Sequence, residues 1–124
     1  MTLLLDTHVL LWWLADDPHL TPTMREAIAD PSTTVMVSAA SAREAAIKAA
    51  VGKHTVPDGL RQELERRGFD ELPVTVEDGL TAGALPRHHG DPFDRMLIAQ
   101  AARRRLVVVT ADRRFADYDV LTLP

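Results

Sequence analysis

The sequence predicts an α/β fold: one domain with a central, mostly parallel sheet of four to five strands and helices on both of its faces. Short, continuously apolar runs at residues 2–5 and 106–110 are typical of strands buried on both sides of a parallel sheet. Segments of helical character alternate with such runs, which is the order expected when helices connect parallel strands. A chain of 124 residues with 46% hydrophobic content can bury one ordinary core, so we expect a single domain over residues 1–124.

Five elements are expected in the first half of the chain, and capping or turn residues mark their ends. They are a strand at residues 2–5, a helix at 7–17, a helix at 22–30, a strand at 33–38 and a helix at 41–52. Thr21 is placed to cap the second of these segments, and Pro22 suits the first helical position, which needs no backbone N–H. Ser41 is expected to begin the alanine-rich third helix, which Gly52 then stops.

The second half of the chain begins with a polar segment and ends with two apolar runs. We expect a polar helix within residues 56–68, a short strand near Val74, a short helix ending at Pro86, a helix starting after Asp91, a strand at 106–110, a short element at 111–118 and a last strand near 119–123. Gly68 is the expected C-terminal stop of the polar helix.

Four acidic residues occupy equivalent places in this alternation of strands and helices. Asp6 comes directly after one apolar strand, and Asp112 comes just after another. Glu44 and Asp94 each lie in the first turns of a helix. Because the carboxyl ends of parallel strands share one edge of a sheet, where ligands bind, we expect these four side chains to meet there.

Each acid, taken alone, has a structural explanation. Asp6 could cap the first helix, and Asp112 the short element that follows it. Ser41 and Glu44 have the spacing of a capping box. Asp94 could serve as a helix-start charge, with Asp91 as the cap of the same helix.

Taken together, the four acids favour a metal site. Capping is served as well by Ser, Thr or Asn, whereas clustered carboxylates repel one another unless a cation neutralises them. The chain has no cysteine, so any metal is held by oxygen or imidazole, and oxygen ligands suit Mg²⁺ or Mn²⁺. Such an ion is often completed by substrate phosphate, which points to phosphodiester cleavage.

The charge distribution allows a nucleic-acid partner only through a local patch, because the formal net charge is −4. Between Arg87 and Arg114 the balance reverses, with seven arginines against three aspartates. The absence of cysteine fits a reducing cytosol. The apolar opening segment is too short for the ~20 residues of a membrane span. We therefore expect a soluble, cytoplasmic protein with no membrane contact.

Four segments of the chain resemble a known family in order and spacing. They are LLLDTHVLLWWL, VSAASAREAAIKAAVGK, HGDPFDRMLIAQA and VVVTAD, and they are similar to the PIN-domain ribonucleases, particularly the VapC-like toxins of toxin–antitoxin pairs. The resemblance spans nearly the whole chain, and DPFDRMLIAQA is its most specific part. It implies a PIN-like fold and an endoribonuclease that depends on Mg²⁺ or Mn²⁺. It also implies a homodimer that is silenced by a small antitoxin protein.

The resemblance places metal-binding, catalytic acids at the four positions selected above, which are Asp6, Glu44, Asp94 and Asp112. Asp91 matches the recurrent acid before Pro-Phe and is expected to be a cap or an outer group. Relatives often carry an aromatic residue directly before the helical glutamate, and Arg43 stands there in this chain.

Other residues near the acids have both a functional and a structural interpretation. Arginine suits bidentate phosphate contact, and four arginines adjoin the acids: Arg43, Arg95, Arg113 and Arg114. Hydroxyl groups that could support the acids belong to Thr7, Ser38 and Thr110. The arginines that end the long helix are expected to be structural, and they are Arg103, Arg104 and Arg105. Lys48 has the spacing of an ion pair with Glu44, whereas His88 and His89 are expected in a solvated loop.

Two other classes of protein compete with this interpretation. A receiver-like signalling domain would need paired acids after the first strand and a late lysine, but only Asp6 follows that strand and no lysine follows Lys53. A catalytically inactive PIN-like interaction domain remains the alternative. The sequence leaves open the RNA target, the number of metal ions and the acid that assists the attacking water.

Overall fold

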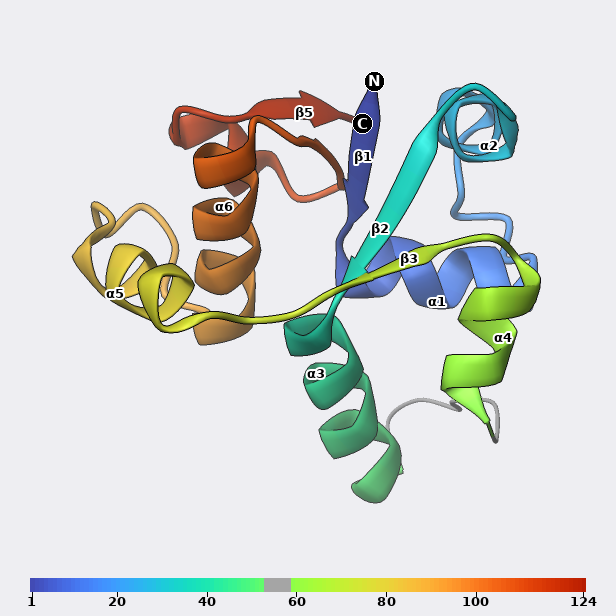
Figure 1. The fold of residues 1–124 in the computed structure, drawn as a ribbon, viewed down its shortest axis with the longest axis horizontal. Coiled ribbons are helices and arrows are strands. Elements are labelled where there is room, and N and C mark those ends of the chain that lie inside the picture. The colour runs from blue at the N-terminus through green and yellow to red at the C-terminus, as the bar shows by residue number, and fades with distance from the viewer. Residues whose placement is uncertain (53–58) are drawn as a thin grey trace.

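The computed structural model describes residues 1–52 and 59–124 and has a five-stranded sheet at its centre (Figure 1). The strands are β1 (Thr2–Leu5), β2 (Thr34–Ser38), β3 (Asp70–Leu72), β4 (Val107–Val109) and β5 (Leu121–Leu123). Their order is β3-β2-β1-β4-β5, and all four neighbouring pairs are parallel. The predicted α/β class and the parallel sheet are confirmed.

Helices cover both faces of this sheet. They are α1 (Thr7–Ala15), α2 (Pro22–Ala29), α3 (Ala39–Ala50), α4 (Leu60–Arg66), α5 (Val76–Ala84) and α6 (Pro92–Arg104), with a short 3-10 helix, η1 (Arg113–Asp117). Consecutive residues of β1 alternate between two cores. Leu3 and Leu5 pack with residues of α1 and α2, whereas Leu4 packs with residues of α6 and η1. This alternation explains why the strand is apolar at every position.

The start of α3 differs from the predicted one. Ser38, the last residue of β2, is the N-cap, and its hydroxyl accepts a hydrogen bond from the Ala40 N–H at 3.0 Å. Ser41 is buried in the first turn, so the predicted capping box with Glu44 is wrong. The helix follows the strand without a connecting loop, which moves its cap three residues toward the N-terminus. Glu44 is thereby left without a capping role.

Strand β3 was predicted near Val74 but ends at Leu72. Its register pairs Ser38 with Leu72, and Pro73 follows directly. Only Leu72 of the three strand residues is buried, because β3 is the edge of the sheet and its acidic residues face solvent. The predicted polar helix is α4, which Gly68 follows at φ 72° as expected, while residues 56–58 lie outside the described part.

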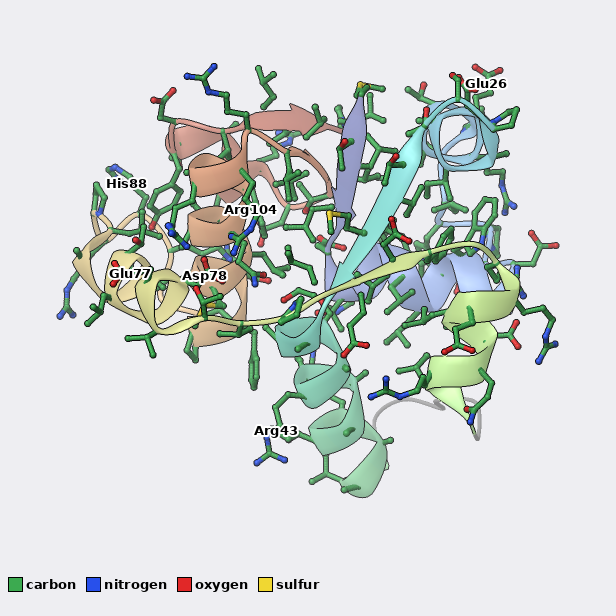
Figure 2. All side chains as sticks on the ribbon, in the orientation of Figure 1. Glu26, Arg43, Glu77, Asp78, His88 and Arg104 are labelled. Carbon is green, nitrogen blue, oxygen red and sulfur yellow. The ribbon has the colours of Figure 1, made fainter. Side chains whose placement is uncertain are left out.

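An ion-pair network fastens α5 to α6. Asp78 is fully buried and accepts hydrogen bonds from Arg103, Arg104 and Gln100. Figure 2 shows Asp78 and Arg104 near each other where the two helices pack. Burial opposes the ionised form, but hydrogen bonds from Arg104, the Thr75 N–H and Arg103 outweigh it and lower the pKa of Asp78. The structural role predicted for Arg103 and Arg104 is confirmed.

Within the described ranges, none of the helices combines the length and apolar character that crossing a membrane requires.

Candidate functional site

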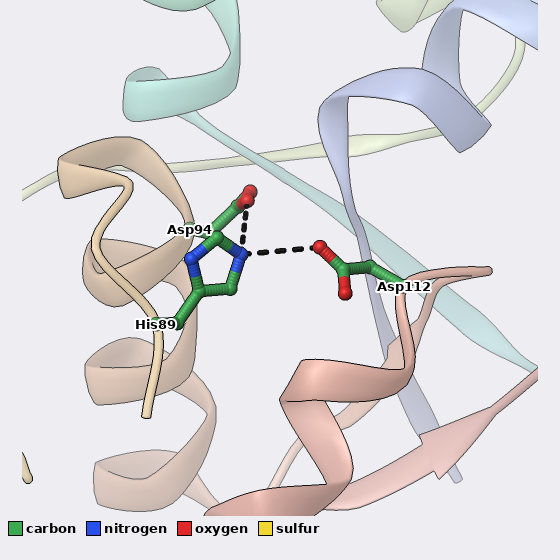
Figure 3. Close-up of side chains that lie close together, drawn as sticks. All are labelled: His89, Asp94 and Asp112. Atoms are coloured by element: carbon green, nitrogen blue, oxygen red, sulfur yellow. Dashed lines mark hydrogen bonds and ion pairs between the residues drawn. The ribbon is translucent and has the colours of Figure 1, made fainter. Parts of the chain in front are cut away.

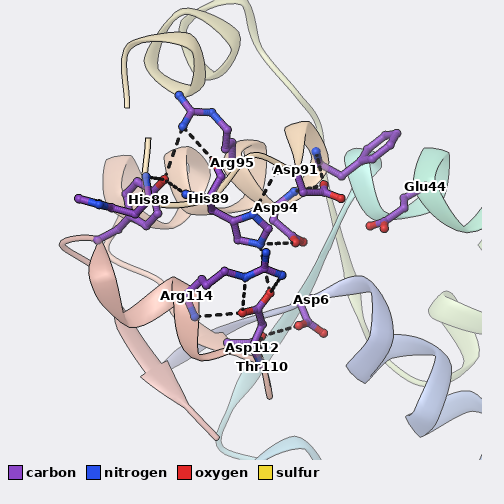
Figure 4. Close-up of polar contacts among 12 residues, drawn as sticks. Asp6, Glu44, His88, His89, Asp91, Asp94, Arg95, Thr110, Asp112 and Arg114 are labelled. Atoms are coloured by element: carbon purple, nitrogen blue, oxygen red, sulfur yellow. Dashed lines mark hydrogen bonds and ion pairs between the residues drawn. The ribbon is translucent and has the colours of Figure 1, made fainter. Parts of the chain in front are cut away.

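The four predicted acids converge at the carboxyl edge of the sheet. Asp6 follows β1, Asp112 follows β4 after two residues, and Asp94 lies in the first turn of α6. Glu44 reaches the same region from α3. Figure 4 shows these four side chains around one common space, drawn from four different elements.

Asp6 both starts a helix and faces the cluster. It is 5% exposed, and its Oδ1 accepts a hydrogen bond from the Val9 N–H at 2.8 Å. Its other oxygen, Oδ2, accepts a hydrogen bond from the Thr110 hydroxyl. Burial raises the pKa of Asp6, and these two hydrogen bonds partly offset the effect. Thr110 therefore makes the supporting contact that the sequence suggested.

Asp94 experiences the charges of the whole cluster. Burial raises the pKa of its carboxyl from 3.8 to about 7. Four negative charges add to this effect, and they belong to Asp91, Glu44, Asp6 and Asp112. Asp91 itself is the N-cap of α6, because its Oδ1 accepts hydrogen bonds from the Phe93 and Asp94 N–H groups. The predicted division between a capping and a cluster-facing aspartate is found.

Glu44 offers an unused oxygen to the cluster. The residue is 4% exposed, and its Oε2 lies 2.8 Å from Nζ of Lys48, the ion pair expected from their spacing. Its Oε1 is buried and has no hydrogen-bond partner among the residues that the structure describes. A buried carboxylate oxygen without a donor is unfavourable unless a cation fills that role.

Asp112 is more strongly engaged by protein groups than the other acids. Its oxygens lie 2.9 and 3.1 Å from Nη2 and Nε of Arg114, and it caps η1 through the Arg114 N–H. Arg114 contributes most to holding the pKa of Asp112 down at about 2. This arginine therefore adjoins the acids as predicted, but it is paired with one of them.

His89 belongs to the site, although it was predicted to lie in a solvated loop. Its side chain is 1% exposed, and Nε2 lies 2.8 Å from an oxygen of Asp94 and 3.1 Å from one of Asp112 (Figure 3). The prediction holds for His88, which is exposed, and is wrong for His89. Tyr118 holds the loop that carries His89, because its hydroxyl accepts hydrogen bonds from the backbone N–H groups of both His88 and His89. No local pattern reveals a contact across 29 residues.

The predicted contact of Arg95 with RNA is also corrected. Its guanidinium donates hydrogen bonds to four backbone carbonyls, those of Ala82, Leu85, Pro86 and His89. Figure 4 shows it directed away from the four acids, toward α5. Arg95 thus fixes the loop before α6 instead of facing a substrate. Arg43 and Arg113 remain exposed, and Figure 2 shows Arg43 projecting from α3.

Within the described residues, neither of the other two hydroxyls proposed as supports contacts one of the acids. Thr7 is buried, and its Oγ1 has no hydrogen-bond partner within the described ranges. Ser38 uses its hydroxyl to cap α3.

The donor set fits a hard divalent cation. Four carboxylates face one partly dry space, and the buried Oε1 of Glu44 has no hydrogen-bond partner among the described residues. Burial and the neighbouring acids raise the pKa of Asp94 to about 7, which shows how unfavourable its charge is without a compensating cation. Mg²⁺ and Mn²⁺ prefer such oxygen ligands and offset their mutual repulsion. Ligand atoms of Asp94, Asp112 and His89 lie within 4.8 Å of one another, and the charges of Asp6 and Glu44 act on the same Asp94 carboxyl.

The fold and the acids at the carboxyl edge of its sheet define a PIN domain, and residues 3–121 match that family. The chain therefore belongs to the PIN-domain family. It is 33% identical over 124 residues to Ribonuclease VapC22 of Mycobacterium tuberculosis, which covers 94% of this chain and 92% of the relative.

Solved structures with low sequence identity share the fold. VapBC2 from Rickettsia felis, bound to a DNA fragment from its promoter, gives a TM-score of 0.72 at 14% identity, and the match covers 99% of this chain and 98% of that one. VapBC-1 from nontypeable Haemophilus influenzae gives a TM-score of 0.64 at 20% identity, and the match covers 99% of this chain and 97% of that one. FitAcB from Neisseria gonorrhoeae gives a TM-score of 0.64 at 20% identity, and the match covers 98% of this chain and 96% of that one.

Proposed function

We propose that the protein is a metal-dependent endoribonuclease that cleaves RNA phosphodiester bonds and acts as the toxin of a toxin–antitoxin pair. The observation that carries this proposal is the convergence of four carboxylates, from four elements, at one edge of the sheet. The similarity to Ribonuclease VapC22 over 94% of the chain supports the ribonuclease activity. Because all four acids are present, an enzyme is favoured over a catalytically inactive PIN-like domain.

The chain's own residues would orient the cation and the RNA. When bound, Mg²⁺ or Mn²⁺ supplies an activated water and offsets charge on the leaving oxygen. Asp6 and Asp94 would be the central ligands of the cation. Glu44 and Asp112 would complete its site directly or through water. Thr110 fixes the orientation of Asp6 by donating its hydroxyl hydrogen, and Lys48 fixes Glu44 through one oxygen while leaving the other available.

The rim of the cluster carries positive charge that suits a phosphate backbone. Arg43 directly precedes Glu44 on α3, and Arg113 directly follows Asp112. Both side chains are exposed, so they can contact RNA without first losing a buried partner. Arg114 is held by Asp112 and would reach RNA only from that position.

We further propose a small antitoxin protein and a second copy of the chain as partners, with action in the cytoplasm. VapBC and FitAB complexes are among the structures with this fold. On α1, the partly buried Trp12 and Trp13 pack against the core. Exposed apolar side chains lie instead around α5, at Val74, Val76 and Leu80. Light scattering at micromolar concentration tests the homodimer, which a monodisperse monomer would contradict.

Cleavage by the purified protein, freed of antitoxin, tests the enzymatic proposal. Single-stranded RNA should be cut with Mg²⁺ or Mn²⁺ and should survive when a chelator is in excess. The variant Asp6→Asn should lose activity by orders of magnitude but fold normally, because asparagine caps a helix nearly as well as aspartate. Cleavage that continues in excess chelator, or in folded Asp6→Asn, would contradict the carboxylate–metal mechanism.

A further inference from the structure

We propose that His89 is a positioning residue of the acid cluster, which holds Asp94 and Asp112 together through its Nε2–H group and does not itself bind the cation. This inference rests on the proposed function, because it assigns a role within the same site. It adds to the four acids a fifth group, of different chemistry, that nothing in the motif of acids implies.

The hydrogen-bonding of the ring determines which nitrogen carries the hydrogen. Nδ1 of His89 lies 3.1 Å from the backbone N of Asp91. A backbone N–H can only donate, so Nδ1 accepts with its lone pair and carries no hydrogen. In the neutral ring the hydrogen is therefore on Nε2.

The Nε2–H group lies between two carboxylates that belong to separate elements. The distances to oxygens of Asp94 and Asp112 are 2.8 and 3.1 Å. Figure 3 marks both contacts with dashed lines. Hydrogen bonds to ionised acceptors are stronger than neutral ones. His89 thus links the start of α6 to the segment after β4 and reduces the repulsion between the two acids.

A metal-ligand role for the same ring conflicts with this arrangement. One atom each of His89, Asp94 and Asp112 lies within 4.8 Å of the others, which is compatible with three ligands of one ion. Coordination through Nε2 requires a free lone pair there, so the hydrogen would have to move to Nδ1. It would then face the Asp91 N–H, leaving two donors opposed at 3.1 Å in a partly buried position.

The surroundings hold the ring in place. It meets Phe115 edge-on, with ring centroids 6.0 Å apart and planes at 87°. The His89 N–H donates to the Tyr118 hydroxyl at 2.9 Å, and the His89 carbonyl accepts from Arg95 at 3.3 Å. Because the histidine is only 3% exposed, bulk water has little room to replace its hydrogen bonds. Arg95 therefore helps to fix the backbone that carries His89.

Loss of the donor should weaken cation binding even though no ligand is removed. Partners that orient metal-binding side chains typically contribute 10–100-fold to metal affinity or activity. We expect His89→Ala to weaken Mn²⁺ binding by about 10–100-fold in folded protein. In His89→Gln the side-chain amide can present an N–H from nearly the position of Nε2, so binding should return to within a few-fold of the parent.

The experiment measures Mn²⁺ binding without RNA, by calorimetry, and nitrogen coupling to bound Mn²⁺, by pulsed electron paramagnetic resonance. Parent protein should show no directly coordinated nitrogen. The exposed neighbour supplies a matched control, and His88→Gln should bind Mn²⁺ like the parent. A nitrogen ligand in the parent that disappears in His89→Gln would overturn the proposal in favour of coordination.

Two further results bear on the proposal. If His89→Ala folds and binds Mn²⁺ with the affinity of the parent, the histidine contributes only to packing and the proposal is overturned. If His89→Ala does not fold, His89→Gln decides, and 10-fold or greater weakening in that variant counts against a donor role.

RNA cleavage separates this proposal from the proposed function. If the parent cleaves RNA with Mn²⁺ and His89→Ala matches it in both affinity and kcat, only the role of His89 fails. If the parent itself shows no metal-dependent cleavage, the proposed function fails, whereas the Mn²⁺ measurements still decide the role of His89.

Discussion

Neutralising Asp94 should stabilise the metal-free protein while abolishing its function. Its side chain is 19% exposed, and its pKa rises from 3.8 to about 7. Each pKa unit corresponds to about 1.4 kcal/mol, so ionised Asp94 destabilises the folded state by on the order of 4 kcal/mol. Asp94→Asn removes the buried charge and its repulsion by the neighbouring acids, but it loses a helix-start charge worth up to ~1 kcal/mol. The relief is the larger effect, and we expect a net gain of roughly 1–3 kcal/mol at pH 8.

The effect should depend on pH in a defined direction. Because the folded pKa of Asp94 lies above the unfolded value, the folded state binds more protons between about pH 4 and pH 7. Parent stability from this group is therefore highest below pH 4 and falls as the pH rises through 7. The advantage of Asp94→Asn should shrink as the pH is lowered toward 4.

Thermal melting in a chelator, and again with Mg²⁺ or Mn²⁺, measures both parts of the prediction. A gain of 1 kcal/mol corresponds to about 4 °C for a domain of this size. A cation at 100 times its Kd stabilises the parent by about 2.7 kcal/mol, and Asp94→Asn should lose most of that increment together with RNA cleavage. Asp91→Asn is the control, since asparagine preserves the cap of α6 and should leave activity near normal. A destabilised but active Asp94→Asn, beside an inactive Asp91→Asn, would refute the assignment.

Two other variants test the structural network and the rim of the site. Asp78→Asn leaves the charges of Arg103 and Arg104 without their buried acceptor, so it should lower the free energy of unfolding by about 3 kcal/mol, while the folded fraction cleaves RNA normally. Because the pKa of Asp78 is lowered, the stabilisation that Asp78 provides should be present above about pH 4 and lost as the pH falls further. If denaturant titration shows that Asp78→Asn lowers the free energy of unfolding by less than about 1 kcal/mol, the structural role of this network is contradicted. Arg43→Ala should raise KM for RNA several-fold and weaken its salt dependence with little change in kcat, and a 100-fold fall in kcat would instead indicate direct participation in the chemistry.

The acids could be predicted from the sequence because their positions follow from topology alone. A residue directly after a buried parallel strand must lie at the carboxyl edge, whatever the surrounding loops do. Asp6 needs only the apolar run before it to be placed there. Asp112 lies near the same edge because only two residues separate it from the end of β4. The number and direction of the strands followed in the same way from continuous apolar runs.

The remaining features depend on contacts that have no local signal. Ser38 and Ser41 both have the chemistry of an N-cap, and only the end of β2 decides between them. Strand β3 exists because β2 offers it an edge, and two of its three residues are acidic and exposed. His89 is buried through Tyr118, a residue from the far end of the chain that no periodicity connects to it.

The use of the same carboxylates for capping and for the candidate metal site has an evolutionary consequence. Asp6 and Asp112 each start a helix with one oxygen and face the cluster with the other. Asparagine can replace aspartate as a cap, and a single nucleotide change converts one codon into the other. An inactive descendant of this gene can therefore arise in one mutational step with its fold, and every surface that binds a partner, intact. Selection against a harmful activity could therefore act through a single Asp→Asn change. The resulting protein would be inactive but would still bind an antitoxin.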